Sequence, residues 1–77
     1  MTKSEAIQAM LNGECVRHKY FDSHEYVKMP DPYTIEDEAG HRCTPEEFWK
    51  YRAHSCFETD WEIVKQRGIT ITTKTTV

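Results

Sequence analysis

The fold of this chain is decided first by its opening stretch, TKSEAIQAMLNG at residues 2–13. Thr2 and Glu5 stand at the spacing of a capping box, in which each side chain binds the backbone amide of the other residue. Apolar residues then recur at helical spacing from Ala6 to Leu11. Gly13 suits the left-handed position that follows a helix. The stretch therefore predicts an amphipathic helix of about three turns.

Short segments with aromatic and β-branched residues follow this helix and predict an antiparallel sheet. Strands are expected at 14–20, 25–29 and 33–36. The first two should form a hairpin, because Phe21-Asp22-Ser23-His24 has the composition of a turn. Pro30-Asp31-Pro32 is expected to end the second strand, since proline cannot donate a bond to a sheet ladder.

A second helix start stands at Thr44-Pro45-Glu46-Glu47, with a capping hydroxyl, proline at the first helical position and acidic residues in the first turn. It predicts a short helix over 45–53. Trp61-Glu62-Ile63-Val64 is a clear strand, with Trp61 and Ile63 on one face. Beyond Gly68, residues 69–73 alternate like another strand.

These elements predict an α+β fold, a small antiparallel sheet or SH3-like barrel with one N-terminal helix and one short internal helix. Residues 1–67 should form a single α+β domain, and residues 68–77 a C-terminal strand or tail. A chain of 77 residues has room for one domain and too little for two. So small a core is marginal alone, which favours partner subunits or another source of stability.

Composition excludes several classes of function. A net charge of −3 argues against binding to a nucleic-acid polymer, which requires a basic surface. No apolar run is long enough for a membrane span or a signal peptide, so we expect a cytoplasmic protein. Three cysteines, an odd number, argue against a disulfide framework and for reduced thiols.

Catalytic and metal-binding motifs are weak. His41-Arg42-Cys43 and His54-Ser55-Cys56 could together offer four zinc ligands, but the spacing is not one of the usual zinc patterns. Ser23-His24-Glu25 only places triad residue types side by side, and a triad is assembled in space. With glycine only at positions 13, 40 and 68, the chain has no phosphate-binding loop. We therefore expect no catalytic residues, no metal and no cofactor, and a protein that is not an enzyme.

Basic and aromatic residues alternate in two places, at Arg17-His18-Lys19-Tyr20-Phe21 and at Trp49-Lys50-Tyr51-Arg52. Such a mixture suits a nucleotide, because aromatic rings stack on bases while arginine and lysine bind phosphate. The structural alternative is that the aromatic residues fill the core and the basic residues face water. Tyr26 and Lys28 on the next predicted strand extend the first group.

The order of motifs resembles a known family. The motifs are Ser4-Glu5-Ala6-Ile7 with Met10-Leu11 and Gly13, then Cys15-Val16-Arg17 with Phe21, then Glu25-Tyr26-Val27, and near the end Phe57 with Asp60-Trp61-Glu62-Ile63-Val64. Together they resemble the small phage proteins of the Thoeris anti-defence type, over roughly residues 4–64. The chain departs from that family at Phe21, where a tryptophan is usual, and at Asp22-Ser23, where Asn-Gly is common.

The resemblance implies an SH3-like fold assembled as a homo-oligomer with ligand pockets between subunits. Members of that family act as sponges, which sequester cyclic nucleotide immune signals in the host bacterial cytosol without cleaving them. The implied ligand is small and anionic, a cyclic ADP-ribose isomer or a cyclic oligonucleotide. Arg17, Phe21, Asp60 and Trp61 match motif positions of the family.

Eight residues are the predicted ligand-binding set; the family supplies four of them and side-chain chemistry supplies the others. They are Arg17, His18, Tyr20, Phe21, Tyr26, Arg52, Asp60 and Trp61. Arg17 and Arg52 are expected to contact phosphate, and Phe21 and Tyr26 to stack on a base or flank a ribose. The alternative function is that of a small phage effector that inhibits a host or defence protein by direct contact. It predicts an exposed aromatic patch.

Overall fold

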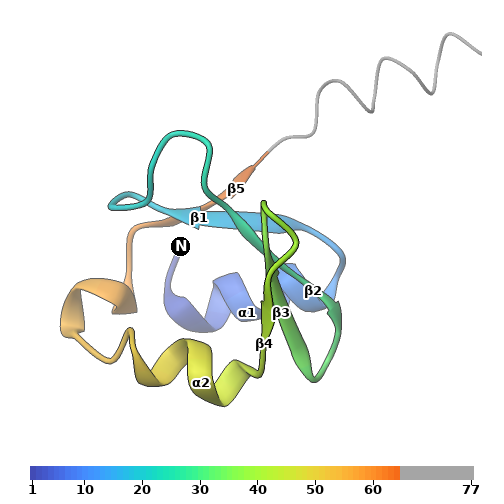
Figure 1. The fold of residues 1–77 in the computed structure, drawn as a ribbon. Coiled ribbons are helices and arrows are strands. Elements are labelled where there is room, and N and C mark those ends of the chain that lie inside the picture. Colours follow the sequence, from blue (N-terminus) through green and yellow to red (C-terminus); the bar gives the residue numbers. More distant parts are fainter. Residues whose placement is uncertain (65–77) are drawn as a thin grey trace, which may run out of the picture.

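Five short strands form one antiparallel sheet in the computed structural model, which describes residues 1–64 (Figure 1). The strands are β1 (Cys15–His18), β2 (Val27–Asp31), β3 (Thr34–Asp37), β4 (Arg42–Cys43) and β5 (Trp61–Val64). Their order in the sheet is β4-β3-β2-β1-β5, so the last strand lies beside the first. The predicted α+β class and the antiparallel sheet are confirmed. The expected strand at 69–73 lies outside the described residues.

Helix α1 (Lys3–Leu11) begins and ends as the sequence predicts. The Thr2 amide donates to Glu5 Oε1 at 2.8 Å, and the Glu5 amide donates to Thr2 Oγ1 at 3.2 Å. The Thr2 amide also holds the pKa of Glu5 below its ordinary value. Gly13 follows the helix with φ of 93°, in the left-handed region. Ala6 and Met10 are fully buried, so the apolar stripe anchors α1 to the sheet.

Strand β2 covers Val27–Asp31 where 25–29 was predicted, so it begins and ends two residues later than expected. The prediction that Pro30-Asp31-Pro32 ends the strand after Met29 is wrong, because Pro30 and Asp31 belong to it. Lys28 pairs with Glu36 and Asp31 pairs with Thr34, and the register shifts between these two pairs. Pro30 lies within that irregularity, where the ladder does not need its missing N–H.

Helix α2 (Pro45–Lys50) has the predicted capping box between Thr44 and Glu47 but is shorter than predicted. At this early end the Arg52 amide donates to the Trp49 carbonyl at 3.1 Å, and Arg52 Nη1 donates to the Phe48 carbonyl at 3.3 Å and so supplies a partner to a carbonyl at the helix terminus. A single 3-10 turn, η1 (Ser55–Glu58), then leads the chain to β5. No sequence pattern predicted this turn.

The core lies between the sheet and the two helices. It consists of Ala6, Met10, Val16, Phe21, Val27, Ile35, Phe48 and Trp61. Its members come from both helices, from four of the strands and from the loop after β1, so one cluster unites the described chain. Within residues 1–64, no helix has the length and apolar character needed to cross a membrane.

Candidate functional site

Arg17 lies on the face of β1 opposite the core and holds the loop that follows the strand. Its Nη1 pairs with Glu62 Oε2 on the neighbouring strand at 2.7 Å. Its Nη2 donates to the carbonyls of Phe21 and Asp22, at 3.0 and 3.3 Å. The guanidinium is thus already bound by protein groups, and its Nε is buried without a hydrogen-bond partner among the described residues. A phosphate at Arg17 would compete with these contacts.

His18 is fully buried and uses both ring nitrogens within the protein. The Tyr20 amide donates to Nδ1 at 3.1 Å, so the proton resides on Nε2, which donates to the Cys56 carbonyl at 2.8 Å. The rings of Phe57 and Trp61 lie 4.6 and 5.1 Å from the imidazole between centroids. This histidine therefore ties the loop after β1 to η1.

Trp61 and Phe21 are also core residues, with 2 % and 9 % of their surface exposed. Their rings meet edge to face, with centroids 5.6 Å apart. Trp61 donates from Nε1 to the Phe57 carbonyl at 2.8 Å, so its polar atom is satisfied internally. We call His18, Phe21, Phe57 and Trp61 the aromatic cluster. Three of its members, His18, Phe21 and Trp61, belong to the predicted ligand-binding set. In this structure their rings pack against one another in tilted and edge-to-face pairs.

Tyr20, Tyr26 and Asp60 lie nearer the surface. Tyr20 is 65 % exposed, and Lys19 Nζ lies 5.3 Å from the centroid of its ring. Asp60 pairs with Lys19 across 3.5 Å and has φ of 71°, the one positive φ at a non-glycine residue among residues 1–64. Tyr26 is half-buried, and its amide donates to Glu38 Oε1 at 3.4 Å.

Arg52, the last of the predicted set, borders a small cavity of about 150 Å³. Its guanidinium carbon lies 4.0 Å from the centroid of the Phe48 ring, a cation–π geometry. Val27, Ile35 and Phe48 supply apolar lining. The polar lining comes from Glu25, Asp37, His41, Arg42, Cys43 and Arg52. We call this space the Arg52 cavity.

Charge around the Arg52 cavity is mixed. Partial burial acts to raise the pKa of Asp37, but the amides of His41 and Ala39 outweigh it and hold this pKa below its ordinary value. Burial raises the pKa of the Cys43 thiol, and the Glu47 carboxylate adds to that rise. Arg42 is held by Glu36 at 2.9 Å, with its side chain 63 % exposed. The cavity thus presents the guanidinium groups of Arg42 and Arg52 together with the carboxylates of Glu25 and Asp37 beside an apolar wall.

Arg42 is not among the residues predicted to bind a ligand, yet the fold brings it to the same cavity as Arg52. Strand periodicity at 41–43 is the sequence signal that bears on its position. His41, Cys43, His54 and Cys56 do not form a zinc site, since residues 1–64 contain no group of three or more His, Cys, Asp or Glu side chains placed to hold a metal ion. His41 instead pairs with Asp37 at 3.4 Å.

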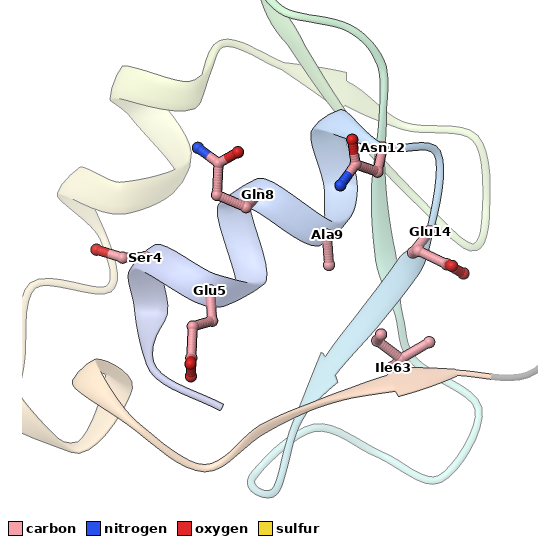
Figure 2. Close-up of a pocket in the computed structure, with 7 residues that line it drawn as sticks. All are labelled: Ser4, Glu5, Gln8, Ala9, Asn12, Glu14 and Ile63. Atoms are coloured by element: carbon pink, nitrogen blue, oxygen red, sulfur yellow. The ribbon is translucent and has the colours of Figure 1, made fainter.

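A second and larger groove, of about 410 Å³, lies between α1 and the strand β5 (Figure 2). Its lining includes Ser4, Glu5, Gln8, Asn12, Glu14 and Ile63. We call it the β5 groove. Its charged groups are carboxylates, so it is unsuited to an anionic ligand.

Comparisons of the chain with models of protein families, with curated proteins and with solved structures found no match.

Proposed function

We propose that this protein binds and sequesters a small anionic cyclic nucleotide without cleaving it, as an anti-defence sponge of a phage. The observation that carries the proposal is the Arg52 cavity, whose lining combines Arg42 and Arg52 with the apolar side chains of Phe48 and Ile35 and with two carboxylates, Glu25 and Asp37. Guanidinium groups bind phosphate through paired hydrogen bonds, and an apolar wall suits the face of a base or a ribose. The order of motifs along residues 4–64 adds the family resemblance to this chemistry.

The size of the cavity favours a binding site shared between subunits. Pockets that enclose a small molecule measure about 300–1,000 Å³, whereas the Arg52 cavity measures about 150 Å³. It can take a phosphate with its neighbouring sugar edge, and a second copy of the chain would cover the remainder. The homo-oligomer, the SH3-like barrel and action in the host bacterial cytosol belong to this proposal.

Calorimetric titration of the purified full-length chain with cyclic ADP-ribose isomers and with cyclic di- and trinucleotides tests the proposal. One class of probe should bind stoichiometrically and be recovered intact after denaturation of the protein. Arg52→Gln should weaken that binding about ten- to hundredfold, the value of one or two charged hydrogen bonds. Lys50→Gln is the matched control, because it removes one positive charge from an exposed position of α2 outside the cavity lining.

Absence of binding by every probe would contradict the proposal. Equal affinity in Arg52→Gln and Lys50→Gln would place the ligand elsewhere. Because Arg52 also caps α2, the folded state of each variant is checked by its melting temperature before titration.

A second candidate function is inhibition of another protein by direct contact. Three tyrosines favour it, since Tyr20, Tyr33 and Tyr51 are 65 %, 80 % and 75 % exposed. Tyrosine is enriched at protein interfaces, where its ring is buried and its hydroxyl stays hydrogen-bonded. This function predicts that the melting temperature responds to a protein partner and to none of the nucleotides. Loss of that response in Tyr33→Ala, together with an unchanged melting temperature of the free variant, would assign the surface.

A further inference from the structure

Strand β5 is an edge of the sheet among the described residues. At Trp61 its outer side is occupied, because the Met1 ammonium donates to the Trp61 carbonyl at 2.8 Å and the Trp61 amide donates to the Met1 carbonyl at 3.1 Å. Backbone groups alternate between the two sides of a strand, so those of Ile63 also point away from β1. No described residue pairs with Ile63 on that side. The edge at Ile63 therefore offers one backbone donor and one backbone acceptor.

The β5 groove lies along this edge. In Figure 2, Glu5 and Ala9 point from α1 toward β5, and Ile63 points back from β5 toward α1. Ala9 and Ile63 are half-buried and supply the apolar part of the lining. The charged part consists of Glu5 and Glu14, and no basic side chain of residues 1–64 lines the groove.

Both carboxylates are suited to bind a cation. The Thr2 amide, which donates to Glu5 Oε1 at 2.8 Å, holds the pKa of Glu5 below its ordinary value, so this carboxylate is ionised at neutral pH. Glu14 is exposed, and its carboxylate has no hydrogen bond or ion pair with another residue of the described chain. The groove thus places two negative charges next to an open strand edge, and its charge complements that of a basic ligand.

We propose that the β5 groove binds an extended segment of a partner protein, which pairs antiparallel with β5 and places a lysine or arginine opposite Ile63. Residues directly opposite each other in an antiparallel pair have their side chains on the same face, so the side chain opposite Ile63 lies in the groove. Its aliphatic stem covers Ala9 and Ile63, and its cation reaches the carboxylates of Glu5 and Glu14. This is strand addition at a sheet edge, with charge as the source of specificity.

A second copy of the chain fits this edge less well than a basic partner. Two copies related by a two-fold axis would present the same surface to each other. Glu5 and Glu14 of one copy would then approach the same carboxylates of the other, and like charges disfavour that contact. The groove shares no lining residue with the Arg52 cavity, so the proposal does not depend on nucleotide binding.

Titration of the isotope-labelled full-length chain with a short synthetic peptide, followed by nuclear magnetic resonance, tests the proposal. The probe is an acetylated and amidated peptide in which lysine and valine alternate. It should shift the amide resonances of Ile63 and Glu14, and it should slow exchange of the Ile63 amide with solvent. The same peptide with glutamate in place of lysine should not bind, because it brings negative charge to the two carboxylates.

N-methylation of the peptide separates its two edges. Because Ile63 exchanges both backbone bonds with the lysine opposite it, the lysine N–H groups of the bound peptide point toward β5 and the valine N–H groups point away. N-methylation at the lysines should therefore weaken binding about tenfold, the value of a lost hydrogen bond. N-methylation at the valines is the matched control and should leave the affinity within about a factor of two to three.

A pair of substitutions tests the charge of the groove. Glu14→Lys should weaken binding of the lysine–valine peptide about tenfold, because it replaces an attraction by a repulsion. Glu58→Lys changes the net charge by the same amount at an exposed position outside the lining, and it should leave the affinity within about a factor of two to three. Neither substitution touches a core residue, so both variants are expected to fold.

Four results would overturn the proposal. The first is that the lysine–valine peptide does not bind. The second is that the Ile63 amide is already protected in the free protein, which would show that the chain itself or a second copy occupies the edge. The third is that the two N-methylated peptides bind equally well, so that no backbone pairing takes place. The fourth is that Glu14→Lys and Glu58→Lys have equal affinities, which would place the peptide outside the groove.

Discussion

The aromatic cluster and the Arg52 cavity carry the same kind of sequence pattern and use it differently. In the cluster, both nitrogens of His18 and the indole nitrogen of Trp61 bind within the chain. In the cavity, Arg52 donates one hydrogen bond to the Phe48 carbonyl, and its guanidinium lies over the Phe48 ring beside open space. Aromatic residues next to basic ones in the sequence are therefore compatible with a closed core and with the lining of an open cavity. The two regions differ in whether the polar side-chain atoms are all hydrogen-bonded to backbone groups of the protein.

Removal of the Trp61 side chain should have the largest effect on the free energy of unfolding. It tests whether the aromatic cluster is part of the core. Trp61→Ala should lower the free energy of unfolding by about 3–5 kcal/mol, the usual cost of truncating a large buried aromatic residue. A domain of this size has little more stability than that, so the variant should be largely unfolded by circular dichroism. Tyr20→Ala, an exposed aromatic residue of the adjoining loop, should change the unfolding free energy by less than about 1 kcal/mol. Similar losses in the two variants would contradict the distinction.

His18→Leu should have the second-largest effect. It separates the contribution of the histidine's hydrogen bonds from that of its buried apolar volume. Leucine keeps an apolar group at a fully buried position but leaves the Tyr20 amide and the Cys56 carbonyl without their partner. We expect the free energy of unfolding to fall by about 2–3 kcal/mol, from the cost of leaving buried polar groups unpaired. Urea denaturation measures this, with an unchanged denaturant slope showing that the folded state is still compact. An unchanged free energy of unfolding in His18→Leu would show that the imidazole does not tie the loop to η1.

The local elements were predictable from sequence because their signals are local. Thr2 with Glu5, Thr44 with Glu47 and the alternation of Trp61–Val64 each act within a few residues, and both helix starts and the strand form as expected. The end of α2 was not predictable in this way. There the Arg52 side chain binds the Phe48 carbonyl, an alternative to continuing the helix that only the packed structure shows.

The candidate site was less predictable, because it depends on which face of the fold each side chain reaches. Tyr20 and Phe21 are neighbours in sequence, yet one is 65 % exposed and the other is 9 % exposed. Their difference arises where the chain turns after β1, with the Phe21 amide bound to the His18 carbonyl. Arg42 and Arg52 line one cavity only because α2 returns the chain to the β3–β4 end of the sheet, which no short motif records.

Asp60 directly precedes Trp61 of the aromatic cluster. Its substitution should have a smaller effect on stability, which comes from the backbone conformation at this position. Its φ of 71° lies in the left-handed region, which aspartate tolerates and β-branched residues avoid. Asp60→Val should lower the free energy of unfolding by about 1–2 kcal/mol, measured by thermal denaturation. Asp60→Gly is the matched control, because it loses the same ion pair with Lys19 but accepts the backbone conformation. If the two variants lose equal stability, the side chain rather than the backbone matters at this position.

Asp37, on the wall of the Arg52 cavity, should give the smallest effect, visible only through its dependence on pH. Amides of His41 and Ala39 bind its carboxylate, each at 2.9 Å, and hold its folded pKa below the ordinary 3.8. The folded carboxylate therefore stays ionised where the unfolded one takes up a proton. The stabilisation is present above pH 3.8 and is lost as the pH falls from there through the folded pKa. Asp37→Asn has no such proton to bind, so its unfolding free energy should fall less steeply over this acid range in urea titrations at stepped pH. Its side chain is 34 % exposed, so screening by water limits the difference to about 0.5 kcal/mol or less. Parallel acid profiles for the two proteins would mean that ionisation of this carboxylate contributes nothing to the stability of the fold.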